Sequence, residues 1–277
     1  METLRRILCF APAALLVAAC DSTAPRMSHH ISLSATTGPA GPAAVAAALA
    51  ERVVTGTGGS VKITSAQLVL SRIKLASDAA CTASSDDTND ADEANEGPDA
   101  EANEPNDDNN EEAECAMVRA GPVLVDLPVD GSTKVFLDGF VPAGTYTGVR
   151  AKLEAVEGDE EGANDFLTAH PGFEGVSVKV VGVFTDAGGT DHAFTFTSGV
   201  EAEIAVDFPA PVTVDANSKN LTLDVDIGSW FKDASGAIID PTNADNQAAI
   251  EHAIRASLSA FEDDDHDGTD DHQEGDR

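Results

Sequence analysis

The chain is poor in aromatic side chains and in bases. Aromatic residues make up 5% of its 277 residues, with one Trp and one Tyr, so a hydrophobic core must rely on aliphatic side chains and Phe. Lys and Arg number 16 against 49 Asp and Glu, which gives a formal net charge of -33. A chain without a basic patch cannot displace counterions from phosphates, so nucleic acid is excluded as a partner. Divalent cations are the ligands expected for a chain this acidic.

Long hydrophobic runs are also missing. Residues 13–19 form a short apolar run that follows Arg5 and Arg6 and leads into Cys20. A basic start, an apolar stretch too short to span a bilayer and small residues before a cleavage point are the parts of a secretory signal. The cysteine directly after Val17, Ala18 and Ala19 resembles the lipobox of bacterial lipoproteins.

That resemblance implies a signal peptide over residues 1–19 and a lipid on the sulfur of Cys20. It implies a mature chain of 258 residues that is anchored to a membrane of the bacterial cell envelope. Whether this is the inner or the outer membrane stays open.

Two acidic runs carry most of the charge. Residues 82–114 hold 14 acids and no base, and residues 262–277 hold nine acids and one Arg. The first run lacks aromatic residues and apolar periodicity, which predicts a disordered insertion. We expect the remainder to divide into a tether over 20–58 and a β-domain over 59–232 that the insertion interrupts.

Two cysteines remain once Cys9 leaves with the signal peptide and Cys20 carries lipid. Cys81 and Cys115 bracket the acidic insertion, and an exported protein lies in a compartment where disulfides persist. We expect these two residues to pair and to close the insertion into a loop. The alternative is two unrelated thiols.

Period-two alternation dominates the middle of the chain. Residues 221–227 alternate apolar and polar side chains, which predicts a strand with one buried and one solvated face. Similar short runs recur between turn signals with no long helix between them. The fold class predicted is therefore mainly β, an antiparallel β-sandwich of the prealbumin or immunoglobulin type with one C-terminal helix.

A turn and strand over residues 140–150 carry a second resemblance. There a Pro-x-Gly turn delivers a strand that bears Tyr146, as in prealbumin-like and carboxypeptidase-regulatory-like surface domains. Together with residues 123–127, it also resembles a lipoprotein-associated domain family of unknown function. The resemblance implies a prealbumin-like sandwich and an envelope location, and it carries over no active site.

Helical spacing appears near the C-terminus. Ile250, Ile254, Leu258 and Phe261 lie four, four and three residues apart, which places them on one helical face. We predict a helix over residues 243–262 that docks on the sandwich.

The acidic tail over 263–277 matches one chemical motif, the twelve-residue calcium loop of EF-hand and thrombospondin-type modules. Alternate acids supply hard oxygens, and Gly268 falls at the sixth position, where the backbone turns sharply. The expected ligands are Asp263, Asp265, Asp267, Thr269 through its carbonyl, Asp271 and Glu274.

Only three residues follow Glu274, so no exiting helix is expected. A weak Ca²⁺ site, with a dissociation constant of about 10⁻⁴–10⁻³ M, fits better than a sensor. The alternative is a solvated acidic tail that fits the pattern by chance.

No serine-nucleophile, zinc-protease, haem-attachment or phosphate-loop motif is present in the sequence. We therefore expect a non-enzymatic binding or structural module of the envelope. One alternative is a calcium-dependent protein that binds carbohydrate or another polymer through residues such as Trp230 and Tyr146. A hydrolase with dispersed carboxylates is a third hypothesis. The protein or glycan partner stays unknown.

Overall fold

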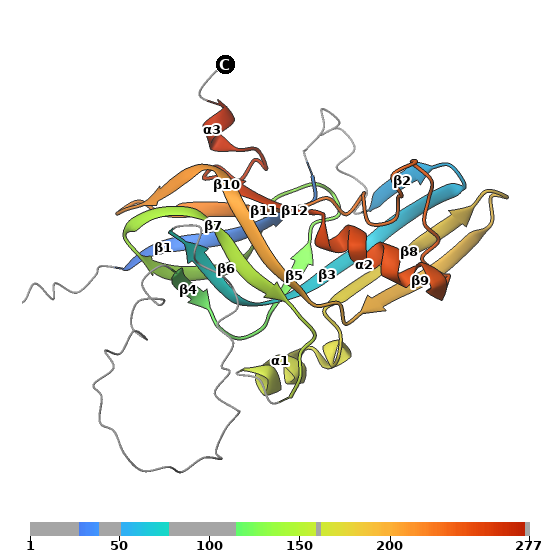
Figure 1. Cartoon of the computed structure of the whole chain (residues 1–277), viewed down its shortest axis with the longest axis horizontal. Coiled ribbons are helices and arrows are strands. Elements are labelled where there is room, and N and C mark those ends of the chain that lie inside the picture. Colours follow the sequence, from blue (N-terminus) through green and yellow to red (C-terminus); the bar gives the residue numbers. More distant parts are fainter. Residues whose placement is uncertain (1–27, 39–50, 78–114, 159–161, 275–277) are drawn as a thin grey trace, which may run out of the picture.

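Figure 1 shows the computed structural model, in which two β-sheets face each other. The structure describes residues 28–38, 51–77, 115–158 and 162–274. The predicted signal peptide, Cys20, Cys81 and the acidic insertion lie outside the described residues. Within the described ranges, no helix is both long enough and apolar enough to cross a membrane.

The larger sheet is built around one long strand. Strand β3 pairs with β8 and β7 along one edge and with β2, β5 and β4 along the other. Strands β10 and β9 complete the two ends. Its strands are β2 (Arg52–Gly56), β3 (Gly59–Ala76), β4 (Cys115–Arg119), β5 (Val123–Leu127), β7 (Gly144–Leu153), β8 (Val178–Asp186), β9 (Asp191–Ser198) and β10 (Ala202–Val214).

The smaller sheet has the order β12-β11-β1-β6 and joins distant parts of the chain. Its pairs are antiparallel except β1 with β11, which run parallel. Its strands are β1 (Ser28–Thr36), β6 (Lys134–Pro142), β11 (Lys219–Val225) and β12 (Leu258–Glu262).

The core lies between the two sheets and consists mostly of aliphatic residues and Phe, as the composition predicted. Leu33 and Leu221 from the small sheet and Ile73 and Leu153 from the large sheet belong to one buried cluster. Trp230 is fully buried, and its indole N–H donates to the Ser257 hydroxyl over 2.8 Å. The prediction of a mainly β, largely antiparallel sandwich is thus confirmed, whereas the finer prealbumin-like assignment stays a prediction.

The helices are short. Helix α1 (Ala163–Ala169) and the 3-10 turn η2 (Pro171–Phe173) bury Phe166 and Phe173 in a small second hydrophobic cluster. This helix was not predicted from the sequence. A 3-10 turn, η3 (Ala244–Asn246), leads into α2 (Gln247–Arg255), which buries Ile250 and Ile254. The last element is the single-turn helix α3 (Asp271–Glu274).

The predicted tether over 20–58 is wrong over β1 and β2. Strand β1 lies inside the small sheet, and its Ile31, Leu33 and Ala35 are almost completely buried. These three residues alternate with polar ones, so the strand signal was present but was masked by the small and polar residues around it.

The predicted helix over 243–262 is wrong over its second half. The helix ends at Arg255, and Leu258–Glu262 pairs as β12 with β11. Ile250 and Ile254 form the helical face, whereas Leu258 only continues that spacing by coincidence. Without β12, one edge of β11 would expose its backbone hydrogen-bonding groups.

Candidate metal centre

The acidic residues after β12 form a loop that folds against the small sheet. The strand ladder continues for one step, since the Asp263 N–H donates to the Asn220 carbonyl over 3.1 Å. The predicted loop therefore follows a strand rather than the helix of an EF-hand, and it ends in α3. The interpretation as a solvated tail is wrong for Asp263, which is 0% exposed.

Asp263 is held by side chains and by the loop backbone. One of its carboxylate oxygens accepts from the Thr222 hydroxyl at 2.9 Å and from the Gly268 N–H at 3.2 Å. The other oxygen accepts from the Asp267 N–H at 2.9 Å. A residue at the first position of the loop thus fixes the backbone at the fifth and sixth positions, where a calcium loop must turn.

Thr222 and Asn220 belong to a polar layer on the outer side of the small sheet. They alternate with core residues of β11 and therefore point to the opposite face. The Ser34 hydroxyl donates to the Asn220 side chain at 2.7 Å, and the Asn220 amide donates to Thr222 at 3.1 Å and to the Asp263 carbonyl at 2.7 Å. The face that was expected to be solvated is buried here because the acidic loop covers it.

Three alternate acids at the start of the loop come together as the motif predicted. One carboxylate oxygen from each of Asp263, Asp265 and Asp267 lies within 4.8 Å of the others. Oxygens bound to one Ca²⁺ at about 2.4 Å can be at most about 4.8 Å apart, and these three meet that condition for sharing one ion. Three carboxylates form a hard donor set that suits Ca²⁺ better than soft metals.

The loop backbone adopts the turns that this arrangement needs. His266 and Gly268 both have positive φ, at 61° and 83°. A Cβ on Gly268 would lie 3.2 Å from the Thr133 hydroxyl and 3.5 Å from the Thr36 hydroxyl. These two hydroxyl oxygens are buried and have no hydrogen-bond partner among the residues that the structure describes.

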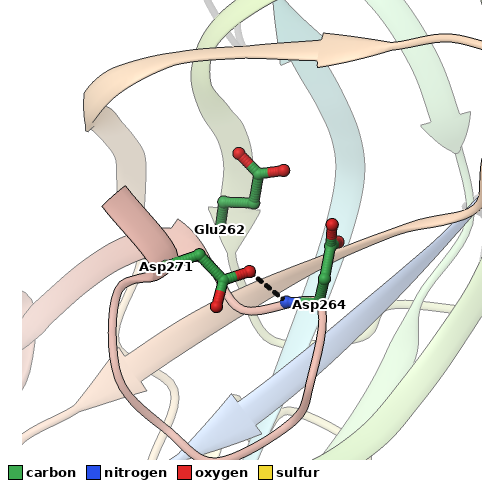
Figure 2. Close-up of side chains that lie close together, drawn as sticks. All are labelled: Glu262, Asp264 and Asp271. Atoms are coloured by element: carbon green, nitrogen blue, oxygen red, sulfur yellow. Dashed lines mark hydrogen bonds between the residues drawn. The ribbon is translucent and has the colours of Figure 1, made fainter. Parts of the chain in front are cut away.

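Three further acids form a second cluster. One oxygen from each of Glu262, Asp264 and Asp271 lies within 4.8 Å of the others. Figure 2 shows these three side chains and the Asp264 N–H, which donates to Asp271 over 2.7 Å. The Lys219 ammonium binds both Glu262 and Asp264, the latter at 2.7 Å. The structure thus groups Asp271 with Glu262 and Asp264 rather than with Asp263.

The remaining predicted ligands have separate positions. The Thr269 N–H donates to Asp267 over 2.7 Å, and its hydroxyl donates to the same oxygen. Glu274 ends α3, and its side chain lies outside the described residues. Cys115 begins β4, and Cys81, its partner in the predicted disulfide, lies outside the described residues.

Burial sets the ionisation of the loop's first residue. It raises the pKa of Asp263, and hydrogen bonds from Thr222, Gly268 and Asp267 only partly offset this effect. The Asp267 charge raises that pKa further. Bringing Asp263 and Asp267 together without a cation therefore costs electrostatic free energy that a bound cation would relieve.

The sequence predicts the convergence of Asp263, Asp265 and Asp267 but not the residues that the loop packs on. Thr222 and Asn220 lie 41 and 43 positions before Asp263 in the chain, so no local pattern links them to the loop. The local sequence signal for these residues is the polar half of the alternation in β11, and that pattern predicts a surface that faces water.

Comparisons with known proteins leave the function open. No protein-family model matches the chain, and no curated protein matches its sequence. One solved structure, MbnP from Methylosinus trichosporium, is similar at 12% identity and a TM-score of 0.32, covering 77% of this chain and 83% of that one. A superposition this loose defines neither a shared fold nor a shared site.

Proposed function

We propose that this protein is a lipid-anchored, non-enzymatic module of the bacterial cell envelope whose C-terminal loop binds Ca²⁺. The observation that carries the calcium part is the convergence of Asp263, Asp265 and Asp267 on a loop that is docked to the small sheet. The lipid anchor rests on the lipobox resemblance at Cys20.

The docked loop gives calcium a structural role. Asp263 is anchored in the polar layer, whereas Asp265 and Asp267 are exposed and lie close to it. An ion shared by the three carboxylates would fix the exposed part of the loop to the buried part. Backbone carbonyls, that of Thr269 among them, and water would complete the six to eight oxygen ligands that Ca²⁺ takes.

The carbohydrate-binding alternative is weakened because the aromatic rings expected to stack on a sugar are buried. Trp230 is 0% exposed and Tyr146 is 5% exposed, so neither ring offers a face to a sugar. Phe140, at 66% exposed, is the large aromatic side chain that the described surface presents. The structural module is therefore the better-supported proposal.

Calcium calorimetry on the chain from residue 21 onward tests the metal site. Asp265→Asn is the sharpest variant, because within the described residues the Asp265 carboxylate accepts a single hydrogen bond, from the Asp267 N–H at 3.2 Å, so the change leaves the fold largely intact. Asp165→Asn, at an exposed position of α1, is the matched control for charge. We expect saturable one-site binding in the parent and the control, and weakening of about tenfold or more in Asp265→Asn. Equal, non-saturating heats in all three proteins would refute the site.

The anchor is tested separately on the full chain expressed in a bacterium. We expect the mature protein to carry lipid on Cys20 by mass spectrometry and to enter the detergent phase. Cys20→Ala should abolish both properties, and a parent protein that stays unlipidated and water-soluble would remove the anchor from the proposal.

A further inference from the structure

Lys219 is a base placed among the acids of the loop. It begins β11, and its side chain is 22% exposed. Its ammonium binds a carboxylate oxygen of Glu262 and, at 2.7 Å, one of Asp264. The other oxygen of Asp264 accepts from the Asn220 N–H at 2.9 Å. One lysine therefore connects the last residue of β12 and the second residue of the loop to the start of β11.

Glu262 and Asp263 point to opposite sides of the small sheet. Glu262 lies opposite Leu221, a core residue, so it and Lys219 share the inner side of β11 at the margin of the sandwich. Asp263 belongs to the polar layer on the outer side. Because these neighbouring acids point in opposite directions, the acids on each side of the sheet need hydrogen-bond donors or a positive charge of their own.

We propose that Lys219 is a positioning residue for the calcium loop, holding Glu262 and Asp264 on its own side so that Asp263, Asp265 and Asp267 are left to face one another. This inference rests on the proposed function for its calcium consequence. Its structural part, that Lys219 orders the loop, applies with or without the ion.

Lys219 has two possible effects on calcium affinity, and they have opposite signs. As a positive charge near an anionic site, Lys219 should repel Ca²⁺, so its removal should tighten binding. As a positioning residue, it keeps the loop assembled before the ion arrives, so its removal should weaken binding. Burial lowers the pKa of Lys219, but the hydrogen bonds that its ammonium donates to Asp264 and Glu262, and the charges of these two residues, raise that pKa to a net value above the usual range. The amine therefore stays charged at neutral pH.

Hydrogen exchange in EDTA tests the positioning step without calcium. Lys219→Met keeps the length of the side chain but removes its charge, whereas Lys219→Arg keeps the charge and several donors. We expect exchange of the Asn220, Asp264, Asp267 and Gly268 amides to accelerate about tenfold in Lys219→Met and to return toward the parent rate in Lys219→Arg. Lys62→Met, which removes an exposed lysine of β3, is the charge control and should leave these amides unchanged.

Calcium calorimetry on the same proteins supplies the second measurement. Weaker binding in Lys219→Met, with recovery in Lys219→Arg, supports the inference. Parent-like exchange, or tighter calcium binding, in Lys219→Met overturns it. A parent protein that binds no calcium, together with faster exchange in Lys219→Met, refutes the proposed function while leaving the ordering role of Lys219 in place.

Discussion

The Thr222 hydroxyl donates a hydrogen bond to the Asp263 carboxylate over 2.9 Å, and both residues are fully buried. This contact joins a central strand of the small sheet to the first residue of the acidic loop. A carboxylate out of water needs its hydrogen bonds, so the contact fixes where the loop begins.

Replacing Thr222 with Val tests that contact. The change keeps the shape of the side chain but leaves the buried Asp263 oxygen with one donor fewer, which costs about 1–3 kcal/mol. We expect a lower free energy of unfolding in urea and weaker calcium binding. Thr195→Val, at an exposed position of β9, is the control and should change stability by less than about 0.5 kcal/mol. Equal effects of the two changes would contradict the role of Thr222.

Gly268 can be tested against a glycine of the same conformation in open space. Gly268 and Gly189 have φ of 83° and 81°, so alanine brings similar backbone strain of about 1–2 kcal/mol to each. A Cβ at Gly268 meets two threonine hydroxyls within 3.5 Å, whereas one at Gly189 meets nothing within 4 Å. We expect Gly268→Ala to destabilise the protein more than Gly189→Ala in thermal unfolding. Equal melting temperatures of the two variants would show that separating the loop from the small sheet costs no stability.

Calcium stabilisation should depend on pH through Asp263. Its pKa is raised in the folded protein, so the folded state binds this proton more tightly than the unfolded chain. Without calcium, lowering the pH through that raised pKa relieves the penalty of a buried charge and adds stability from this group. Ca²⁺ needs the ionised carboxylate, so the calcium-induced rise in melting temperature should shrink over the same pH range.

The measurement is the difference in melting temperature between calcium and EDTA across acidic and neutral pH. We expect the difference to fall at a higher pH than the usual range of an aspartate. A difference that stays constant down to that usual range would remove Asp263 from the set of ligands.

The short helix α2 should be held mainly by two side chains. Ile250 and Ile254 are each 1% exposed and belong to the main core, whereas the helix itself has only nine residues. An isolated helix of this length is unstable in water, so packing must hold it. We expect Ile254→Ala to cost about 2–5 kcal/mol in urea unfolding, and the exposed Ala249→Gly to cost about 1 kcal/mol. A loss below 1 kcal/mol for Ile254→Ala would mean that the helix is not docked through this face.

The sequence allowed the fold class to be predicted because strand alternation is a local property. The alternation of β11 and the Pro142–Gly144 turn between β6 and β7 are both present in the structure. Strand β12 could not be recognised in this way, because Ile250, Ile254, Leu258 and Phe261 also fit a helix. Its structure depends on the free edge of β11, which lies more than 30 residues away in the chain.

The same limit applies to the metal centre. The spacing of Asp263, Asp265 and Asp267 predicts their convergence because the loop is short, and the structure brings them together. The partners of the loop, Thr222 and Lys219, come from another strand and become visible only through the sheet register.

The order of strands in the small sheet constrains how the chain can fold. Strand β1 is the first described strand and β12 the last, yet only β11 separates them. The pairing of Leu33 with Leu221 joins residues that lie 188 positions apart in the chain, and such distant contacts slow folding. During synthesis the large sheet can form first, before β11 is available to pair with β1. The protein therefore reaches its complete structure only when nearly all of its chain has emerged, and aggregation through the unpaired β1 is the hazard of that interval.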